Sequence, residues 1–384
     1  MKRKRWLRTG LVALLALVLT GCGWGERDGV TDPGADQVVP VMLPTEQEGE
    51  AGGHTFARLE GVPEYYRVAG WLDQDRLIGL SGEQITIFNV VSGAVDHLGI
   101  KAWNIWLSPD RGMIAFNNET GLSCATVDGG QVRLLVPADA DMGVPDGVVW
   151  SPDSRRMVYR VDHEWDSVHY VFDLDTGVPQ ELNTVLDGYF MNRAVAWPTP
   201  ERILFQTVAS VGHDGAREYT EIGYRGDLAV LNLENGEYSL VTGVKDGEFL
   251  VFQGLTSANE VVFILKDPVK GSREWGILAL DGSTVQVQEV DQNVTAVQVA
   301  DGEPAVYFIR EAGPVGENMR LEFLHAGTQD WTAAVTLAEI TSESGFFSFV
   351  PSPDSGRLVL SFAVLEPVPE GFQTKEYLYL VTRR

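Results

Sequence analysis

The sequence predicts an all-β protein made of seven copies of one four-stranded unit, and two repeated patterns lead to this prediction. The first pattern is a tight turn between two apolar runs, which recurs at intervals of 36 to 58 residues, about 47 on average. The second is a β-rich run that follows each of these hairpins and ends in most copies at a glycine turn. A strand-turn-strand unit that recurs in this way indicates a repeat architecture.

Three copies of the turn share the sequence Ser-Pro-Asp, at residues 108–110, 151–153 and 352–354. Proline presets the backbone of a turn, and aspartate hydrogen-bonds its own backbone nearby. Four weaker copies complete the set. The residue that comes just before each turn, called the anchor residue below, is Trp71, Leu107, Trp150, Trp197, Leu255, Val299 or Pro351. The seven β-rich runs begin at Ile85, Leu122, His169, Leu228, Gly276, Leu321 and Tyr377.

An interval of about 47 residues is the length of one four-stranded blade of a β-propeller. The two counts therefore predict a seven-bladed β-propeller, with six or eight blades as the alternatives. The last copy lacks a fourth strand, because only residues 381–384 follow its third strand. Residues 55–59 lie just before the first copy, and we expect them to close the ring by pairing with residues 377–380, since an unpaired strand would leave an open edge.

The Ser-Pro-Asp turn and its flanking strands resemble the WD40-like repeat called PD40, which occurs in TolB-like propellers and in the propeller domains of prolyl oligopeptidases. The resemblance covers roughly residues 55–384 and is strong in three repeats and weak in four. The usual glycine after Ser-Pro-Asp is displaced in Arg111-Gly112 and Ser355-Gly356. The resemblance implies a propeller fold, for which six blades are usual in TolB-like proteins.

The N-terminus has the pattern of a secretory signal. Basic residues at 2–5 and 8 precede an apolar core at 11–19 that is too short to span a bilayer. Residues 19–22, Leu-Thr-Gly-Cys, resemble the bacterial lipobox, in which cleavage before the cysteine leaves it to carry lipid such as palmitate. The alternative is an ordinary signal peptide with an incidental cysteine.

Three segments follow from this interpretation. They are a signal peptide at 1–21, a flexible acidic tether at 22–54 and the propeller at 55–384. Lipidation of Cys22 would anchor the protein on the outer side of the cell membrane in a monoderm, or in the outer membrane if the cell is diderm. Cys124 then has no partner for a disulfide, and we expect it to be a small buried residue.

The chain is strongly acidic, with 29 lysines and arginines against 54 aspartates and glutamates. Such a surface repels nucleic acid, which we exclude as a partner. A solvated acidic surface with no specific role is the simplest explanation of this composition. Cationic partners or loosely held divalent cations also suit it.

No motif for catalysis, phosphate binding or metal binding is present, so the sequence predicts no enzymatic activity, no cofactor and no metal. Residues 173–177, Asp-Leu-Asp-Thr-Gly, suggest a calcium loop but lack the downstream ligands, and we expect a turn there. His163 and His213 fall in long loops of adjacent blades, where they can converge.

Long connections are expected on one face of the propeller, between second and third strands and between blades. Long loops on a rigid scaffold usually carry binding residues, and aromatic and arginine side chains dominate interface energetics. The candidate binding face consists of Trp165, Tyr189, Phe190, Arg193, Arg217, Tyr219, Tyr224, Trp275 and Phe372.

The sequence thus predicts a monomeric, membrane-anchored, extracytoplasmic lipoprotein. Its non-catalytic propeller would bind an envelope protein or an extracellular ligand. The alternative is a propeller enzyme that acts on a sugar, lactone or similar solute at the mouth of the central channel.

Overall fold

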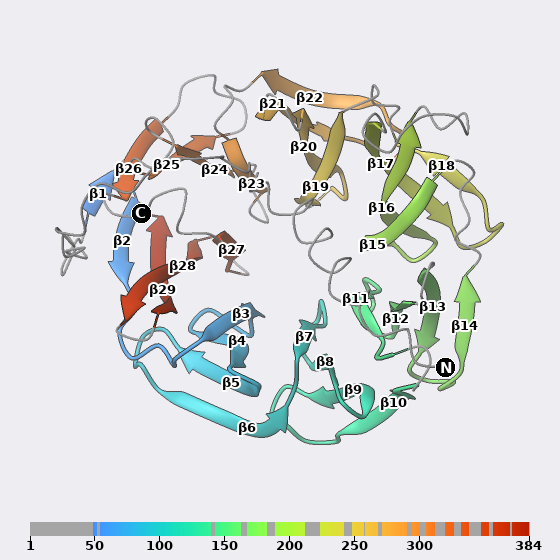
Figure 1. Ribbon diagram of the computed structural model, residues 1–384, viewed down its shortest axis with the longest axis horizontal. Coiled ribbons are helices and arrows are strands. Elements are labelled where there is room, and N and C mark those ends of the chain that lie inside the picture. Colours follow the sequence, from blue (N-terminus) through green and yellow to red (C-terminus); the bar gives the residue numbers. More distant parts are fainter. Residues whose placement is uncertain are drawn as a thin grey trace, which may run out of the picture. The chain divides into compact units, whose positions relative to one another are not determined.

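The computed structural model (Figure 1) describes the chain from residue 49 onward, with gaps. The described residues are 49–51, 54–139, 143–162, 167–182, 189–211, 223–241, 248–256, 258–267, 271–289, 294–299, 305–311, 319–325, 332–337, 347–352, 356–368 and 371–383. They belong to one compact unit, Glu46–Arg384. Within this part of the chain, no helix is long and apolar enough to cross a membrane.

The described regular structure consists of β-strands, which confirms the all-β prediction. Most strands form antiparallel groups of four in chain order. Four groups are separate sheets: β3 (Tyr66–Trp71), β4 (Arg76–Ser81), β5 (Gln84–Asn89) and β6 (Val95–Lys101); β7 (Asn104–Leu107), β8 (Met113–Asn118), β9 (Gly121–Thr126) and β10 (Arg133–Pro137); β11 (Asp146–Trp150), β12 (Arg156–Asp162), β13 (Ser167–Asp173) and β14 (Pro179–Leu182); β23 (Val294–Val299), β24 (Ala305–Glu311), β25 (Met319–His325) and β26 (Thr332–Leu337).

The remaining strands form two larger sheets. The first has eight strands: β15 (Tyr189–Thr199), β16 (Arg202–Val211), β17 (Gly223–Asn232), β18 (Tyr238–Leu240), β19 (Phe249–Leu255), β20 (Val261–Asp267), β21 (Gly271–Leu278) and β22 (Thr284–Glu289). The second has five: β1 (Gly49–Ala51), β2 (His54–Arg58), β27 (Phe347–Pro351), β28 (Arg357–Val368) and β29 (Gly371–Arg383). Six of the seven anchor residues are the last residue of the first strand of a group, and Trp197 lies near the end of β15.

The eight-stranded sheet differs from the separate blades that the sequence predicts. It consists of two antiparallel groups, β15–β18 and β19–β22, joined by a short parallel contact between Gly226 and Phe249. The Gly226 N–H donates to the Glu248 carbonyl at 3.0 Å. A Cβ at Gly226 would lie only 2.6 Å from the Phe249 ring, so the missing side chain is what allows the two groups to touch.

The hydrophobic core lies in layers between neighbouring groups. Ile85 of β5 packs in one cluster with Ile114 and Phe116 of β8, and the next layer joins Ala115 to Trp150. A further layer joins the first group to the last, since Trp71 and Leu77 cluster with Leu378 of β29. Face-to-face packing of successive antiparallel sheets is the arrangement of propeller blades. Figure 1 shows the first strands of the groups, such as β3, β7, β11 and β15, on the inner side of this arrangement.

An N-terminal strand completes the last group, as the sequence predicts. β2 pairs antiparallel with β29, with Thr55 opposite Thr382 and Arg58 opposite Tyr379. β1 then pairs with the free edge of β2. Residues 49–51 and 54 therefore form strands, although the sequence analysis assigns them to a flexible tether; the reason is that β2 offers unpaired backbone groups to the residues before it.

The Ser-Pro-Asp phrases at 108–110 and 151–153 form tight turns at one end of the sheets, which confirms their structural role. The Ser151 hydroxyl, fully buried, donates to Asp153 Oδ1 at 2.6 Å and accepts from the Arg156 N–H at 2.8 Å. Ser108 repeats both bonds with Asp110 and Met113. For the third copy, the Arg357 N–H donates to Ser352 Oγ at 2.9 Å, and Pro353 and Asp354 lie outside the described residues.

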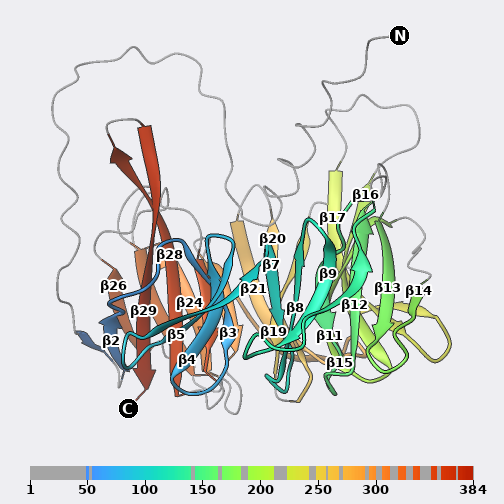
Figure 2. The same cartoon turned by 90° about the horizontal axis from the view of Figure 1, so that it is seen from below.

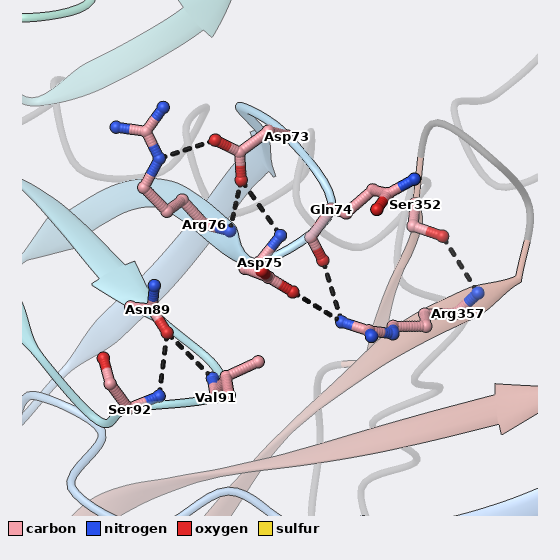
Figure 3. A network of polar contacts seen from close by, with 9 residues as sticks. All are labelled: Asp73, Gln74, Asp75, Arg76, Asn89, Val91, Ser92, Ser352 and Arg357. Atoms are coloured by element: carbon pink, nitrogen blue, oxygen red, sulfur yellow. Dashed lines mark hydrogen bonds and ion pairs between the residues drawn. The ribbon is translucent and has the colours of Figure 1, made fainter.

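The turns also bond to turns of neighbouring groups. The Arg357 guanidinium donates to the Gln74 carbonyl and to Asp75 Oδ1, both at 3.0 Å, across the junction of the last and first groups (Figure 3). The Trp71 indole crosses the same junction and donates to the Val350 carbonyl at 2.8 Å. This end of the molecule is therefore occupied by contacts that hold the groups together.

Candidate functional site

The opposite end of the sheets carries the long connections, and much of their length is β-structure rather than loop. Figure 2 shows the hairpins β28–β29 and β16–β17 extending beyond their neighbours at this end. β28 and β29 have 12 and 13 residues, and β16 and β17 have 10 each, compared with six in β4 and β5. We call this end of the molecule the hairpin face.

The structure places five of the predicted binding residues on strands of this face. Tyr224 is near the start of β17, opposite Ser210, and Phe372 is near the start of β29, opposite Pro367. Tyr189, Phe190 and Arg193 belong to the first half of β15 rather than to a loop. These residues lie on strands and not in loops because the antiparallel strands stay paired further than the sequence predicts. The residues on both sides of a connection add backbone hydrogen bonds to the sheet.

Four predicted functional residues lie outside the described residues, namely Cys22, Trp165, Arg217 and Tyr219. The same holds for His163 and His213, so their convergence stays a prediction.

Trp275 was wrongly predicted as a binding residue. Its side chain has no exposed surface, and it is among the largest fully buried side chains of the described core. β21 begins at Gly271, so Trp275 lies within a strand, opposite Ile264 and Gln288, and not in a connection. Because successive side chains of a strand alternate between its faces, position near a connection does not determine exposure.

The repeat reveals a second set of residues on the hairpin face that the sequence analysis missed, except for Arg193. Arg67, Trp103, Asp146 and Arg193 each lie four residues before an anchor residue, in four successive groups. We call these four residues the inner rim, because they lie at or just before the innermost strands β3, β7, β11 and β15 (Figure 1). Arg67 and Arg193 are exposed, Trp103 is 44% exposed and Asp146 is half-buried.

Hydrogen bonds connect the inner rim from one group to the next. An Arg67 Nη donates to the Trp103 carbonyl across the first junction. The Trp103 N–H in turn donates to the Asn117 carbonyl at 2.8 Å, and the Asn117 amide donates to the Pro145 carbonyl at 2.9 Å, next to Asp146. This path fixes the backbone of three groups relative to one another at the hairpin face.

Glycine 79 allows β3 to come close to β4 beneath the first rim residue. A Cβ at Gly79 would lie 2.3 Å from the Arg67 carbonyl oxygen, a distance that no side chain tolerates. The register shifts here between Val68 and Gly70, which indicates a β-bulge, a feature that redirects side chains. The position of Arg67 thus depends on the local backbone.

Charged residues of β11, β12 and β15 lie at the other end of the inner rim. Arg160 lies opposite Asp146 in the β11–β12 ladder, and its guanidinium pairs with Asp162 at 2.8 Å. Ser167 Oγ donates to Asp162 at 2.7 Å and holds that carboxylate in place. Surrounding protein and the neighbouring charge of Arg160 lower the pKa of the Arg193 guanidinium, while Asp146 opposes this shift.

Arg67 and Arg193 have no ion-pair partner in the described part of the chain. Within the described ranges the Arg193 guanidinium has no hydrogen-bond partner, and Arg67 uses one donor for Trp103. A further cation, Lys266 near the end of β20, has its pKa lowered by burial. As far as the chain is described, the hairpin face therefore carries two arginines without an ion-pair partner, in a chain whose net charge is −25.

No cluster of three or more histidine, cysteine, aspartate or glutamate side chains suited to a metal occurs among the described residues. His169 is buried against the Phe205 ring, with the ring centroids 5.1 Å apart. The suspected calcium loop is a turn in which Asp173 Oδ1 accepts the backbone N–H groups of Asp175 and Thr176. Cys124 is buried on β9, as expected, and burial raises the pKa of its thiol despite the opposing charge of Arg133.

No protein-family model matches the sequence. No curated protein matches it either. A solved structure of an oligogalacturonate lyase in complex with manganese aligns with a TM-score of 0.61 and 13% identity, over 90% of this chain and 97% of that chain. An oligogalacturonate lyase from Vibrio parahaemolyticus gives a TM-score of 0.60 and 11% identity, over 85% and 93%. A chain of the mitotic checkpoint complex gives a TM-score of 0.52 and 11% identity, over 92% of this chain and 98% of that chain.

The fold is of the β-propeller type. Identities this low show the fold alone. The similar structures include enzymes, and their likeness does not decide whether this chain is one.

Proposed function

We propose that this protein is a membrane-anchored, extracytoplasmic lipoprotein whose seven-bladed, non-catalytic propeller binds a partner protein or ligand of the bacterial cell envelope. The observation that carries the binding part is the pair of extended hairpins, β16–β17 and β28–β29, on the face opposite the Ser-Pro-Asp turns (Figure 2). Tyr224 and Phe372 lie on these hairpins, and aromatic residues are common at the centre of interfaces.

The count of seven blades is part of this proposal. It treats β15–β18 and β19–β22 as two blades in spite of their parallel contact, and β27–β29 with β2 as the last blade. In this arrangement the first and last segments of the chain share one blade. Such closure stabilises the ring, because unfolding of either segment would expose an open edge.

The anchor is the lipid on Cys22, and the segment that follows it is the tether. The 26 residues at 23–48 separate Cys22 from β1, and a chain of this length spans at most about 90 Å. A test is metabolic labelling with a radioactive fatty acid. We expect labelled protein in the membrane fraction, and we expect Cys22→Ser to abolish both label and membrane association. Unlabelled wild-type protein would refute the anchor.

Binding by the hairpin face is tested by photo-crosslinking in intact cells. A photoreactive amino acid placed at Tyr224 or Phe372 is expected to give a discrete crosslinked species, since these positions lie on the extended hairpins. The control position is Val132, which precedes β10 and is 56% exposed. Equal crosslinking at Val132, or no product at either hairpin position, would contradict the proposal.

The second candidate is an enzyme that acts on a sugar, lactone or similar solute at the inner ends of the first strands. The inner rim favours it, because charged groups and an aromatic surface along one edge can bind a polar substrate. Oligogalacturonate with and without manganese is the probe that the similar structures suggest. Product formation that is lost in Arg193→Gln would favour the enzyme over the non-catalytic protein.

A further inference from the structure

The inner rim is the strongest unexplained feature of the described surface. The position four residues before the anchor holds Arg67, Trp103, Asp146 and Arg193 in the first four groups, but Val251, Thr295 and Phe347 in the other three. Packing of the first four groups does not require these residues, since each of these groups has buried apolar residues elsewhere in its strands. Charged residues and tryptophan at this position are thus confined to the first four groups.

The four rim residues lie in four successive groups of strands whose first strands contact one another. The contacts from Arg67 through Trp103 and Asn117 to Pro145 link the first three positions. The negative charge of Asp146 favours the charged form of Arg193, and Arg160 pairs with Asp146 in the β11–β12 ladder. Both arginines therefore lie at the ends of one connected arc, with the tryptophan and the aspartate between them.

The arginines at the two ends have donors available for anions. Each guanidinium has five N–H donors in a fork that matches a carboxylate or a phosphate. Among the described residues no carboxylate pairs with Arg67 or Arg193, whereas the nearby Arg160 is neutralised by Asp162. The Arg160 charge beside Arg193 also disfavours the cationic state of Arg193, and a bound anion would relieve this repulsion.

The middle of the arc selects against a third negative charge. The Asp146 carboxylate repels anions, and the exposed Trp103 indole offers a flat apolar surface. A ligand that fits all four residues is therefore acidic at both ends and neutral in between.

We propose that the inner rim binds an elongated solute with two acidic groups, carboxylate or phosphate, one held by Arg67 and the other by Arg193, with its neutral middle over Trp103. This inference deepens the ligand-binding part of the proposed function. It depends neither on the lipid anchor nor on the hairpin partner.

The test measures binding of α,ω-dicarboxylates of increasing length, from glutarate to sebacate, by isothermal titration calorimetry at low ionic strength. The full mature chain is used. We expect affinity to pass through a maximum at the length that reaches both arginines, and we expect hexanoate, with one carboxylate, to bind much more weakly. Bisphosphonates of matched length distinguish phosphate-like from carboxylate ligands, and preference for either one supports the proposal.

Single substitutions separate the roles of the two arginines. Arg67→Gln and Arg193→Gln should each weaken the best ligand about tenfold, the loss of one charge-assisted contact, and remove the length maximum. Arg193→Lys should restore only part of the affinity, because the ammonium keeps the charge but not the fork. Trp103→Ala should weaken all lengths equally.

The matched control is Arg76→Gln, an arginine on the same blade as Arg67 but in the turn at the other end, where it pairs with Asp73. It should leave binding unchanged. The proposal is wrong if no dianion binds, if affinity has no length maximum, or if Arg193→Gln binds like the wild type. Hairpin crosslinks that persist in Arg193→Gln would show that partner binding by the hairpins does not depend on ligand binding by the inner rim.

Discussion

Arg357 Nη1 in β28 lies 3.0 Å from Asp75 Oδ1 in the turn after β3, although the two residues are 282 positions apart in the chain. The same guanidinium nitrogen donates to the Gln74 carbonyl. The contact joins the last group of strands to the first (Figure 3), where the layer around Trp71 and Leu378 also lies. The junction is therefore closed by both apolar packing and hydrogen bonds.

Replacing Arg357 with methionine should destabilise the protein by about 1–2 kcal/mol, because a carbonyl and a carboxylate lose their shared donor. Exposure of Asp75 limits the contribution of the ion pair itself. The measurement is urea unfolding followed by circular dichroism. Arg76→Met is the control, since its ion pair with Asp73 lies within one turn, and it should cost at most about 0.5 kcal/mol.

Removing β2 should destabilise the last group far more than removing the residues before it. A chain that starts at Gly61 leaves the β29 edge unpaired, whereas a chain that starts at Gly49 keeps both β1 and β2. We expect the shorter chain to melt at a clearly lower temperature and to aggregate through its open edge. Equal melting temperatures of the two chains would contradict the role of β2 in closure.

Ser151→Ala should lower the free energy of unfolding by about 1–3 kcal/mol, since the hydroxyl is buried and hydrogen-bonds both Asp153 and the Arg156 backbone. The Ser151 hydrogen bond also lowers the pKa of Asp153 below the ordinary value of 3.8. The stabilisation is thus present above pH 3.8 and is lost as pH falls through the lower folded-state value. Acid titrations of stability should show a smaller loss in the variant, and the exposed Ser92→Ala should behave like the wild type.

Lys266→Met should stabilise the protein at neutral pH, because burial disfavours the ammonium and lowers its pKa. Below that lowered pKa the lysine is charged in both states, so the folded state bears the full desolvation cost. The cost decreases as pH rises from the folded-state value toward 10.5. Thermal melting from pH 7 to pH 10 should show the advantage of the variant shrinking, whereas the exposed Lys101→Met should show no such trend.

Trp275→Ala should destabilise the protein by about 3–5 kcal/mol, as expected for a fully buried indole. Trp103→Ala, at a side chain that is 44% exposed, should cost far less. Chemical unfolding compares the two variants directly. A small effect at Trp275 would return that residue to the candidate binding face.

The repeat explains why so much of the fold follows from sequence. Pro-Asp turns and apolar runs are local features, and each of the seven anchor residues lies at or near the end of a first strand. The pairing of β2 with β29 also follows, because a missing fourth strand requires a donor. Lipidation at Cys22 and the roles of Trp165, Arg217 and Tyr219 stay predictions.

The candidate site was less predictable, since loop length says nothing of side-chain direction. Trp275 lies next to a predicted loop, yet the strand continues past it and buries it. The sequence does mark Arg67, Trp103 and Asp146, because each lies four residues before an anchor residue. This common spacing indicates a shared site only after the structure has placed the inner strands next to one another.

By itself, the sequence determined the β-rich repeat, its turns and the strand that completes the last group, because local backbone preferences and hydrophobic alternation govern these features. Tertiary structure decided which side chains meet. Arg67 contacts Trp103, and Arg357 contacts Asp75, only because packed sheets bring distant strands side by side. Contacts between blades depend on the register and approach of whole sheets, which no single stretch of sequence encodes.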